Sequence, residues 1–190
     1  LVLLVLLGLN VDYSGQTRKK NGNGNGNAKS VNGSPLRLSL PMKKDSVKFA
    51  LIGDTGTGTA KQQQLADLLL LARQSFPFEL VVLVGDNLYG GEKPADYKSK
   101  FEDVYRPLID QKVKFYAALG NHDEPAQRFY EHFNMDGKEY YRISKGNVAF
   151  YALNSNYMDK KQVDWLNSEL AKDTSEWKIA FFHHPPYSSG

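Results

Sequence analysis

The sequence predicts an α/β fold built in layers, on the basis of two observations. Apolar, strand-like runs alternate with helical stretches from about residue 47 onward. Three of these runs end in a glycine followed by a polar residue, namely Asp54, Asp86 and Asn121, and a later run ends at His183. The order of elements predicts a sheet that is mostly parallel at first and then antiparallel.

The first half of the folded region is expected to contain three strands and two helices. Residues 47–53 form an apolar run typical of a buried strand, and residues 59–74 repeat apolar residues at helical spacing. A second strand is predicted at 79–85, a helix at 95–104 and a third strand at 113–119. Glycine after each apolar run lets the chain turn sharply where the strand ends.

The second half is expected to continue with a short helix at 126–133. Residues 140–143 and 148–153 flank a Lys-Gly-Asn turn and predict a hairpin. Residues 160–171 have apolar residues on one helical face, and 178–182 form a last apolar strand.

Composition divides the chain into three parts. Residues 1–9 are almost wholly apolar but too few to span a bilayer, which favours the remnant of a signal peptide or signal-anchor over a buried strand of a preceding domain. Residues 10–45 are rich in Asn and Gly and predict a disordered linker. Residues 46–190 form the folded part. The protein is therefore expected to be secreted or periplasmic, in any case extracytoplasmic.

Charge and cysteine content limit the partners. Seven basic and two acidic residues give residues 1–45 a net charge of +5, so the remainder carries −2 of the total of +3. A slightly acidic folded part argues against nucleic-acid binding, and contact with a membrane is expected only through the possible N-terminal signal-anchor. The sequence has no cysteine, which excludes disulfides and thiolate zinc sites.

Each strand-end motif has an ordinary structural explanation when taken alone. Asp86 could cap a turn, Tyr89 could be a half-buried aromatic residue, and Asn121 could occupy a turn. His183-His184 before two prolines is harder to explain in this way, because imidazoles held rigidly at a strand end are good ligands and poor core residues. Four such strand ends that can share one sheet edge predict a metal site.

The chemistry of these side chains indicates which metals they suit. Carboxylate, phenol, amide and imidazole groups combine hard oxygen with borderline nitrogen donors, which fits a pair of divalent or trivalent first-row metals. The glycine-rich run at residues 53–58 lacks the Gly-Lys-Ser/Thr of a phosphate-binding P-loop. The metal interpretation is therefore preferred over a nucleotide-binding loop.

Together, Gly-Asp54-x-Gly, Gly-Asp86-x-x-Tyr89, Gly-Asn121-His122-Asp123 and His183-x-Pro resemble the ordered motifs of the calcineurin-like metallophosphoesterases. The tyrosine three residues after the second aspartate resembles the purple acid phosphatases, including their small tartrate-resistant branch. The resemblance covers about residues 47–190 and implies a layered α/β/β/α sandwich.

The resemblance implies a role for each matching residue. Asp54 and Tyr89 would bind the first metal, Asp86 would bridge both metals, and Asn121 and His183 would bind the second.

Outside the metal ligands, the resemblance places His122 facing the phosphate. As the catalytic pair, His122, oriented by Asp123, would donate a proton or hydrogen bond to the leaving oxygen. His184 and Asn87 are the expected substrate contacts.

The implied activity is hydrolysis of phosphate monoesters by a dinuclear centre of Fe(III) with Fe(II), Zn or Mn, that is, an acid phosphatase acting on small-molecule phosphate esters. The alternatives are a phosphodiesterase or nucleotide hydrolase of the wider group, or a non-catalytic fragment that retains the fold. The Gly-His-x-His motif that completes the family's site is absent from the sequence. The sandwich is therefore expected to be incomplete, and this chain alone is expected to be inactive.

Overall fold

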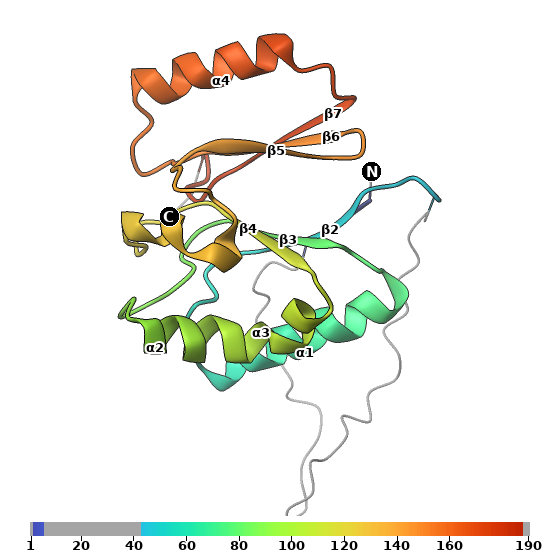
Figure 1. Ribbon diagram of the computed structural model, residues 1–190, viewed down its shortest axis with the longest axis vertical. Helices are drawn as coiled ribbons and strands as arrows, with labels where there is room; N and C mark the ends of the chain where they lie inside the picture. Colours follow the sequence, from blue (N-terminus) through green and yellow to red (C-terminus); the bar gives the residue numbers. More distant parts are fainter. Residues whose placement is uncertain (1, 6–42, 188–190) are drawn as a thin grey trace, which may run out of the picture.

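Four layers make up the computed structural model, which describes residues 2–5 and 43–187 (Figure 1). Helices α1 to α3 cover one face of the first sheet, the second sheet stands on its other face, and helix α4 covers the second sheet. This arrangement confirms the α/β/β/α sandwich expected from the sequence. The greater part of the linker predicted at 10–45 lies outside the described residues.

The first sheet is wholly parallel, and its strands lie in chain order. These strands are β1 (Val2–Val5), β2 (Lys48–Ile52), β3 (Leu80–Leu83) and β4 (Lys114–Ala117). All four residues of β3 are buried, because one face meets the helices and the other meets the second sheet. The carboxyl ends of the strands therefore lie along one edge, where the polar motifs begin.

Strand β1 falls within the apolar run at residues 1–9. It pairs in parallel with β2, with Val2 opposite Lys48 and Val5 opposite Leu51. The signal-segment interpretation of residues 1–9 and the export of the protein stay predictions. Among the described residues, no helix is long and apolar enough to cross a membrane.

The helices that cover the first sheet are α1 (Ala60–Ser75), α2 (Pro94–Tyr97) and α3 (Asp103–Asp110), with a π-helical turn at Lys98–Glu102 between the last two. The predicted helix at 95–104 therefore continues six residues further, through Pro107. Val104, Tyr105 and Leu108 are buried on the face toward the sheet, and this packing outweighs the cost of a proline inside the helix.

The second sheet contains β5 (Tyr141–Lys145), β6 (Val148–Ala152) and β7 (Trp177–Phe181). Strands β5 and β6 form the predicted antiparallel hairpin, but β7 runs parallel to β6. This corrects the expectation that the later strands are antiparallel. The reason is α4 (Lys160–Lys172), which forms the crossover that a parallel pair requires.

The helix predicted at 126–133 is divided into two short 3-10 turns, Pro125–Phe129 and Glu131–Phe133. Tyr130 between them has extended backbone angles, and Asn134 after them is left-handed. Phe133 and Gln127 are fully buried, so this segment is anchored by separate side chains and not by a continuous helical face.

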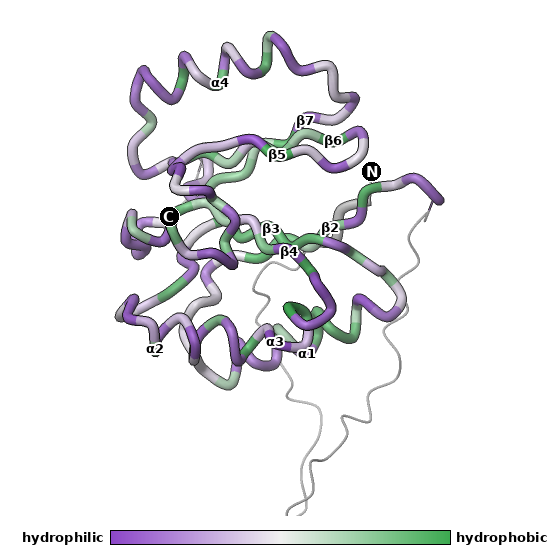
Figure 2. The backbone as a smooth tube through the Cα atoms, in the orientation of Figure 1, coloured by the Kyte–Doolittle hydropathy of each residue, from purple (hydrophilic) through white to green (hydrophobic). Residues whose placement is uncertain are grey.

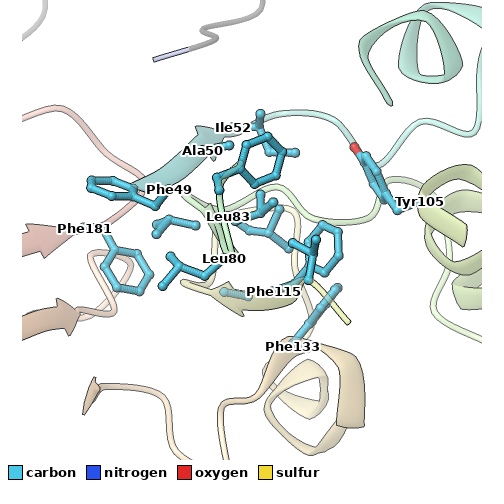
Figure 3. Close-up of a cluster of buried hydrophobic side chains, with 14 of the residues drawn as sticks. Phe49, Ala50, Ile52, Leu80, Leu83, Tyr105, Phe115, Phe133 and Phe181 are labelled. Atoms are coloured by element: carbon cyan, nitrogen blue, oxygen red, sulfur yellow. The ribbon is translucent and has the colours of Figure 1, made fainter. Parts of the chain in front are cut away.

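Aromatic side chains join the two sheets into one core (Figure 3). Phe49 of the first sheet packs edge-on against Phe150 of the second, with ring centroids 5.0 Å apart. Figure 2 shows the apolar strands in the middle of the molecule and a largely polar α4 outside. The Tyr141 hydroxyl donates to the Ala117 carbonyl at 2.8 Å, which fixes the second sheet against the end of β4.

Candidate metal centre

The loops after four strands bring their polar side chains together. Asp54 follows β2, Asp86 follows β3, and Asn121 follows β4, so these three come from the carboxyl edge of the parallel sheet. His183 follows β7, which belongs to the other sheet. The expectation that all four strands share one sheet edge is thus corrected, because the fourth donor reaches the site across the boundary between the sheets.

Asp54, Asp86 and His183 form a compact donor group. Each offers one ligand atom, and these atoms all lie within 4.8 Å of one another. Asp54 is exposed, His183 is half-buried, and Asp86 is buried. The group therefore has an open side toward solvent and a closed side toward the core.

The backbone is held in an unusual conformation at both aspartates. Asp54 has φ 55° and Asp86 has φ 52°, in the left-handed region that few residues other than glycine adopt. The Asp54 N–H donates to the Gly85 carbonyl at 3.1 Å, which ties the two loops together. Such strain is characteristic of functional loops, where it aims a side chain that a relaxed turn would point elsewhere.

Gly120 makes close packing around Asp86 possible. A Cβ at this position would lie 2.2 Å from Asp86 Oδ1, closer than any real contact. The glycine therefore permits the loop after β4 to approach the buried Asp86 carboxylate directly. In this position the His122 N–H donates to Asp86 Oδ1 at 3.1 Å.

Tyr89 places its hydroxyl between the two carboxylates. The distances are 2.7 Å to Asp86 Oδ2 and 3.3 Å to Asp54 Oδ1. Burial, followed by the Asp86 carboxylate, raises the pKa of the phenol well above its ordinary value. A cation among these three oxygens would act in the opposite sense and favour the phenolate. The Tyr89 carbonyl is held by Lys100 Nζ at 2.8 Å, which fixes the loop from outside.

The His183 ring is oriented for ligation through Nε2. Its Nδ1 lies 3.0 Å from the Val84 carbonyl, which can only accept, so Nδ1 carries the hydrogen. Nε2 then faces Asn121 Oδ1 at 3.0 Å and Asp86 Oδ1 at 3.4 Å. The Nε2 lone pair and these two oxygens lie close together, and a metal cation among them fits this arrangement.

His122 lies beside the donor group without joining it. Its side chain is exposed, and its ring centroid is 5.1 Å from that of Tyr89. The histidine is thus on the open side of the site, where a substrate would approach.

Asp123 does not orient His122, which corrects the catalytic role expected for it. Its carboxylate is buried and accepts five N–H groups from other parts of the loops. The donors are Asn87 N (2.8 Å), Leu88 N (3.2 Å) and Gln127 Nε2 (2.8 Å) to Oδ1, and Gly120 N (2.8 Å) and Asn87 Nδ2 (3.0 Å) to Oδ2. Burial raises the pKa of this carboxyl, and the N–H donors act against that effect. Asp123 therefore fastens the loop after β3 to the loop after β4.

Asn87 likewise faces the interior and not the substrate side. Its side chain is 4% exposed, and its Nδ2 lies within 3.1 Å of acceptors on Ala118, Asp123 and Gln127. Two amide hydrogens shared among three internal acceptors leave none for a substrate. The structure gives Asn87 a supporting position in place of the expected substrate contact.

His184 and the loop after β6 complete the surroundings of the site. His184 is exposed, and both its backbone N–H and its Nδ1 contact Ser155 Oγ, at 3.0 and 2.9 Å. Asn156 Nδ2 donates to the Gly120 carbonyl at 2.8 Å. No role is predicted from the sequence for Ser155 and Asn156. Both follow a buried strand, as do the polar residues that indicated the other loops.

These four layers and their cluster of carboxylate, phenol, amide and imidazole donors define a metal-binding α/β/β/α sandwich. The chain belongs to the calcineurin-like phosphoesterase family, whose model matches residues 47–190. Among solved structures, the chain is similar to a dimetal phosphatase from Danio rerio, with a TM-score of 0.55 and 15% identity over 74% of this chain and 70% of that one. No curated protein matches the chain. Family membership supports metal-dependent hydrolysis of phosphate esters.

Proposed function

We propose that the full-length protein hydrolyses phosphate monoesters at a dinuclear metal centre, in the manner of a purple acid phosphatase. The observation that carries this proposal is the Tyr89 hydroxyl, which lies 2.7 Å from Asp86 Oδ2 and 3.3 Å from Asp54 Oδ1. A phenolate beside two carboxylates is a hard, anionic donor set that favours trivalent iron over zinc. The proposed centre is Fe(III) paired with Fe(II), Zn or Mn.

The buried carboxylate of Asp86 supports the assignment of two neighbouring metals. Its Oδ2 faces Tyr89, whereas its Oδ1 faces His183 Nε2 at 3.4 Å. The two oxygens therefore point toward different donor sets. Asp54 and Tyr89 would hold the first metal, Asn121 and His183 the second, and Asp86 would contact both.

The metals and the side chains around them have different roles in the proposed reaction. Two bound metals supply the positive charge that neutralises the phosphate oxygens and activates water for attack on phosphorus. As the ester P–O bond breaks, the leaving oxygen needs a proton, and the proposal assigns its donation to His122, which is on the exposed side of the site. The hydrogen bond from its backbone N–H to Asp86 Oδ1 keeps this histidine beside the donor group, where the phosphate would bind.

The test is spectroscopic and uses the full-length protein reconstituted with iron. A tyrosinate bound to Fe(III) gives a visible charge-transfer band, so the wild type should be coloured and Tyr89→Phe should lose the band. Tyr140→Phe is the matched control, because Tyr140 packs on Trp165 beneath α4, away from the donor group. A colourless zinc protein that prefers an aryl phosphodiester to an aryl monoester would overturn the proposal in favour of a diesterase.

A further inference from the structure

Ser155 connects the loop after β6 to His184, the second of the two histidines that follow β7. Its hydroxyl oxygen lies 3.0 Å from the His184 backbone nitrogen and 2.9 Å from His184 Nδ1. The neighbouring Asn156 binds the Gly120 carbonyl at 2.8 Å, so this loop also contacts the loop that carries Asn121 and His122. Ser155 is therefore in a position to control the orientation of His184 relative to the site.

Both contacts of Ser155 Oγ are with His184. The backbone N–H of His184 can only donate, so the hydroxyl accepts that bond. The hydroxyl keeps its own hydrogen and a second lone pair for Nδ1 at 2.9 Å, and we assign the direction in which Oγ–H donates to Nδ1. In this arrangement Nδ1 is an acceptor, and the hydrogen of the neutral imidazole resides on Nε2.

The adjacent His183 is held in the opposite tautomer. Its Nδ1 donates to the Val84 carbonyl at 3.0 Å and leaves a lone pair on Nε2. The ring centroids of His183 and His184 are 5.1 Å apart and the ring planes are inclined by 73°, so the two rings face different surroundings. One histidine offers a lone pair for a cation, and the other offers an N–H group. Phosphate oxygens without protons are pure acceptors, which an N–H group can bind.

We propose that Ser155 is a positioning residue that holds His184 as the Nε2–H tautomer, so that this ring donates a hydrogen bond to an oxygen of the phosphate ester. The proposal rests on the proposed phosphoesterase function and adds a residue to it. Loss of one neutral hydrogen bond corresponds to a change of about 3- to 10-fold. Ser155→Ala is therefore expected to raise KM for an aryl phosphate by about that factor with metal content unchanged, and Ser155→Thr, which keeps the hydroxyl, should restore it.

The experiment measures the tautomer and the kinetics separately. Nitrogen-15 NMR of the histidine-labelled, zinc-loaded full-length protein should show His184 protonated at Nε2 in the wild type and a mixture of tautomers in Ser155→Ala. Ser144→Ala is the control, because the side chain of this exposed serine of β5 has no hydrogen-bond partner among the described residues. In a His184→Ala background, Ser155→Ala should have no further effect on KM, whereas a purely structural serine would still change it.

The outcomes separate this inference from the function on which it rests. If the protein has no phosphatase activity but His184 changes tautomer in Ser155→Ala, the phosphoesterase function fails, and with it the substrate contact, while the positioning by Ser155 stands. If the enzyme is active and Ser155→Ala leaves both the tautomer and KM unchanged, the positioning role is overturned. A Ser155→Ala effect of equal size in the His184→Ala background would also overturn it.

Discussion

Replacing Asp123 by asparagine should destabilise the protein strongly, although the two side chains have almost the same shape. In the wild type, Oδ1 accepts three N–H groups and Oδ2 accepts two. Whichever oxygen becomes an amide nitrogen, at least two buried donors lose their acceptor. Each such loss costs about 1–3 kcal/mol, so Asp123→Asn should lower the free energy of unfolding by about 2–6 kcal/mol. Domains are typically stable by about 5–15 kcal/mol, so this is a large fraction.

The assay is urea unfolding of the full-length protein followed by circular dichroism, with Asp164→Asn as the control. Asp164 is 60% exposed and pairs with Lys160 on the surface of α4, so its substitution should change stability by no more than about 0.5 kcal/mol. Because Asp123 joins the loops that carry Tyr89 and Asn121, Asp123→Asn should also weaken metal binding. A change in unfolding free energy below about 1 kcal/mol would refute the view that this carboxylate fastens the loops.

Two other predictions concern the proton donor and the acid stability of the second sheet. His122→Ala should keep the metal content of the wild type and lower kcat on an aryl phosphate by about 10²- to 10⁴-fold, and loss of metal from this variant would contradict its position outside the ligand set. The Tyr151 hydroxyl, with Ser175 and Arg142, holds the pKa of Asp173 below its ordinary value. The stability that Asp173 contributes is therefore present above its unfolded pKa of about 3.9 and is lost as the pH falls below it, so thermal midpoints measured from pH 6 to 2.5 should drop more steeply for wild type than for Asp173→Asn.

Strands β2, β3 and β4 could be predicted because a parallel strand buried on both faces is a continuous apolar run, whereas the apolar run that contains β1 was interpreted as a signal segment. The direction of β7 could not, since the apolar residues of Trp177–Phe181 are compatible with either orientation. Direction depends on the crossover through α4, which is a property of topology and not of the strand itself. The continuation of α3 through Pro107 was missed for a related reason, because burial of neighbouring side chains overrides a local signal.

Sequence could indicate the residues of the donor group because metal binding restricts residue type and position at strand ends, and the structure brings Asp54, Asp86 and His183 together. The roles of the residues that support them were harder to assign, because Asp and Asn, as at Asp123 and Asn87, are also common in exposed turns. Only the three-dimensional contacts show that Asp123 is 8% exposed and saturated with donors. Ser155 belongs to the same category, since a serine in a loop predicts nothing until the histidine opposite it is known.

Because His183 follows a strand of the second sheet, its position has a consequence for how the two sheets separate when the protein unfolds. A cation held jointly by donors from both sheets links halves that are otherwise joined mainly by side-chain packing, such as that of Phe49 on Phe150. Binding that requires both halves adds about 4 kcal/mol to stability when the metal is present at 1,000 times its dissociation constant. Chelation would then remove a cross-link between the sheets, and we expect substitutions deep in the aromatic interface to lower metal affinity without touching a ligand.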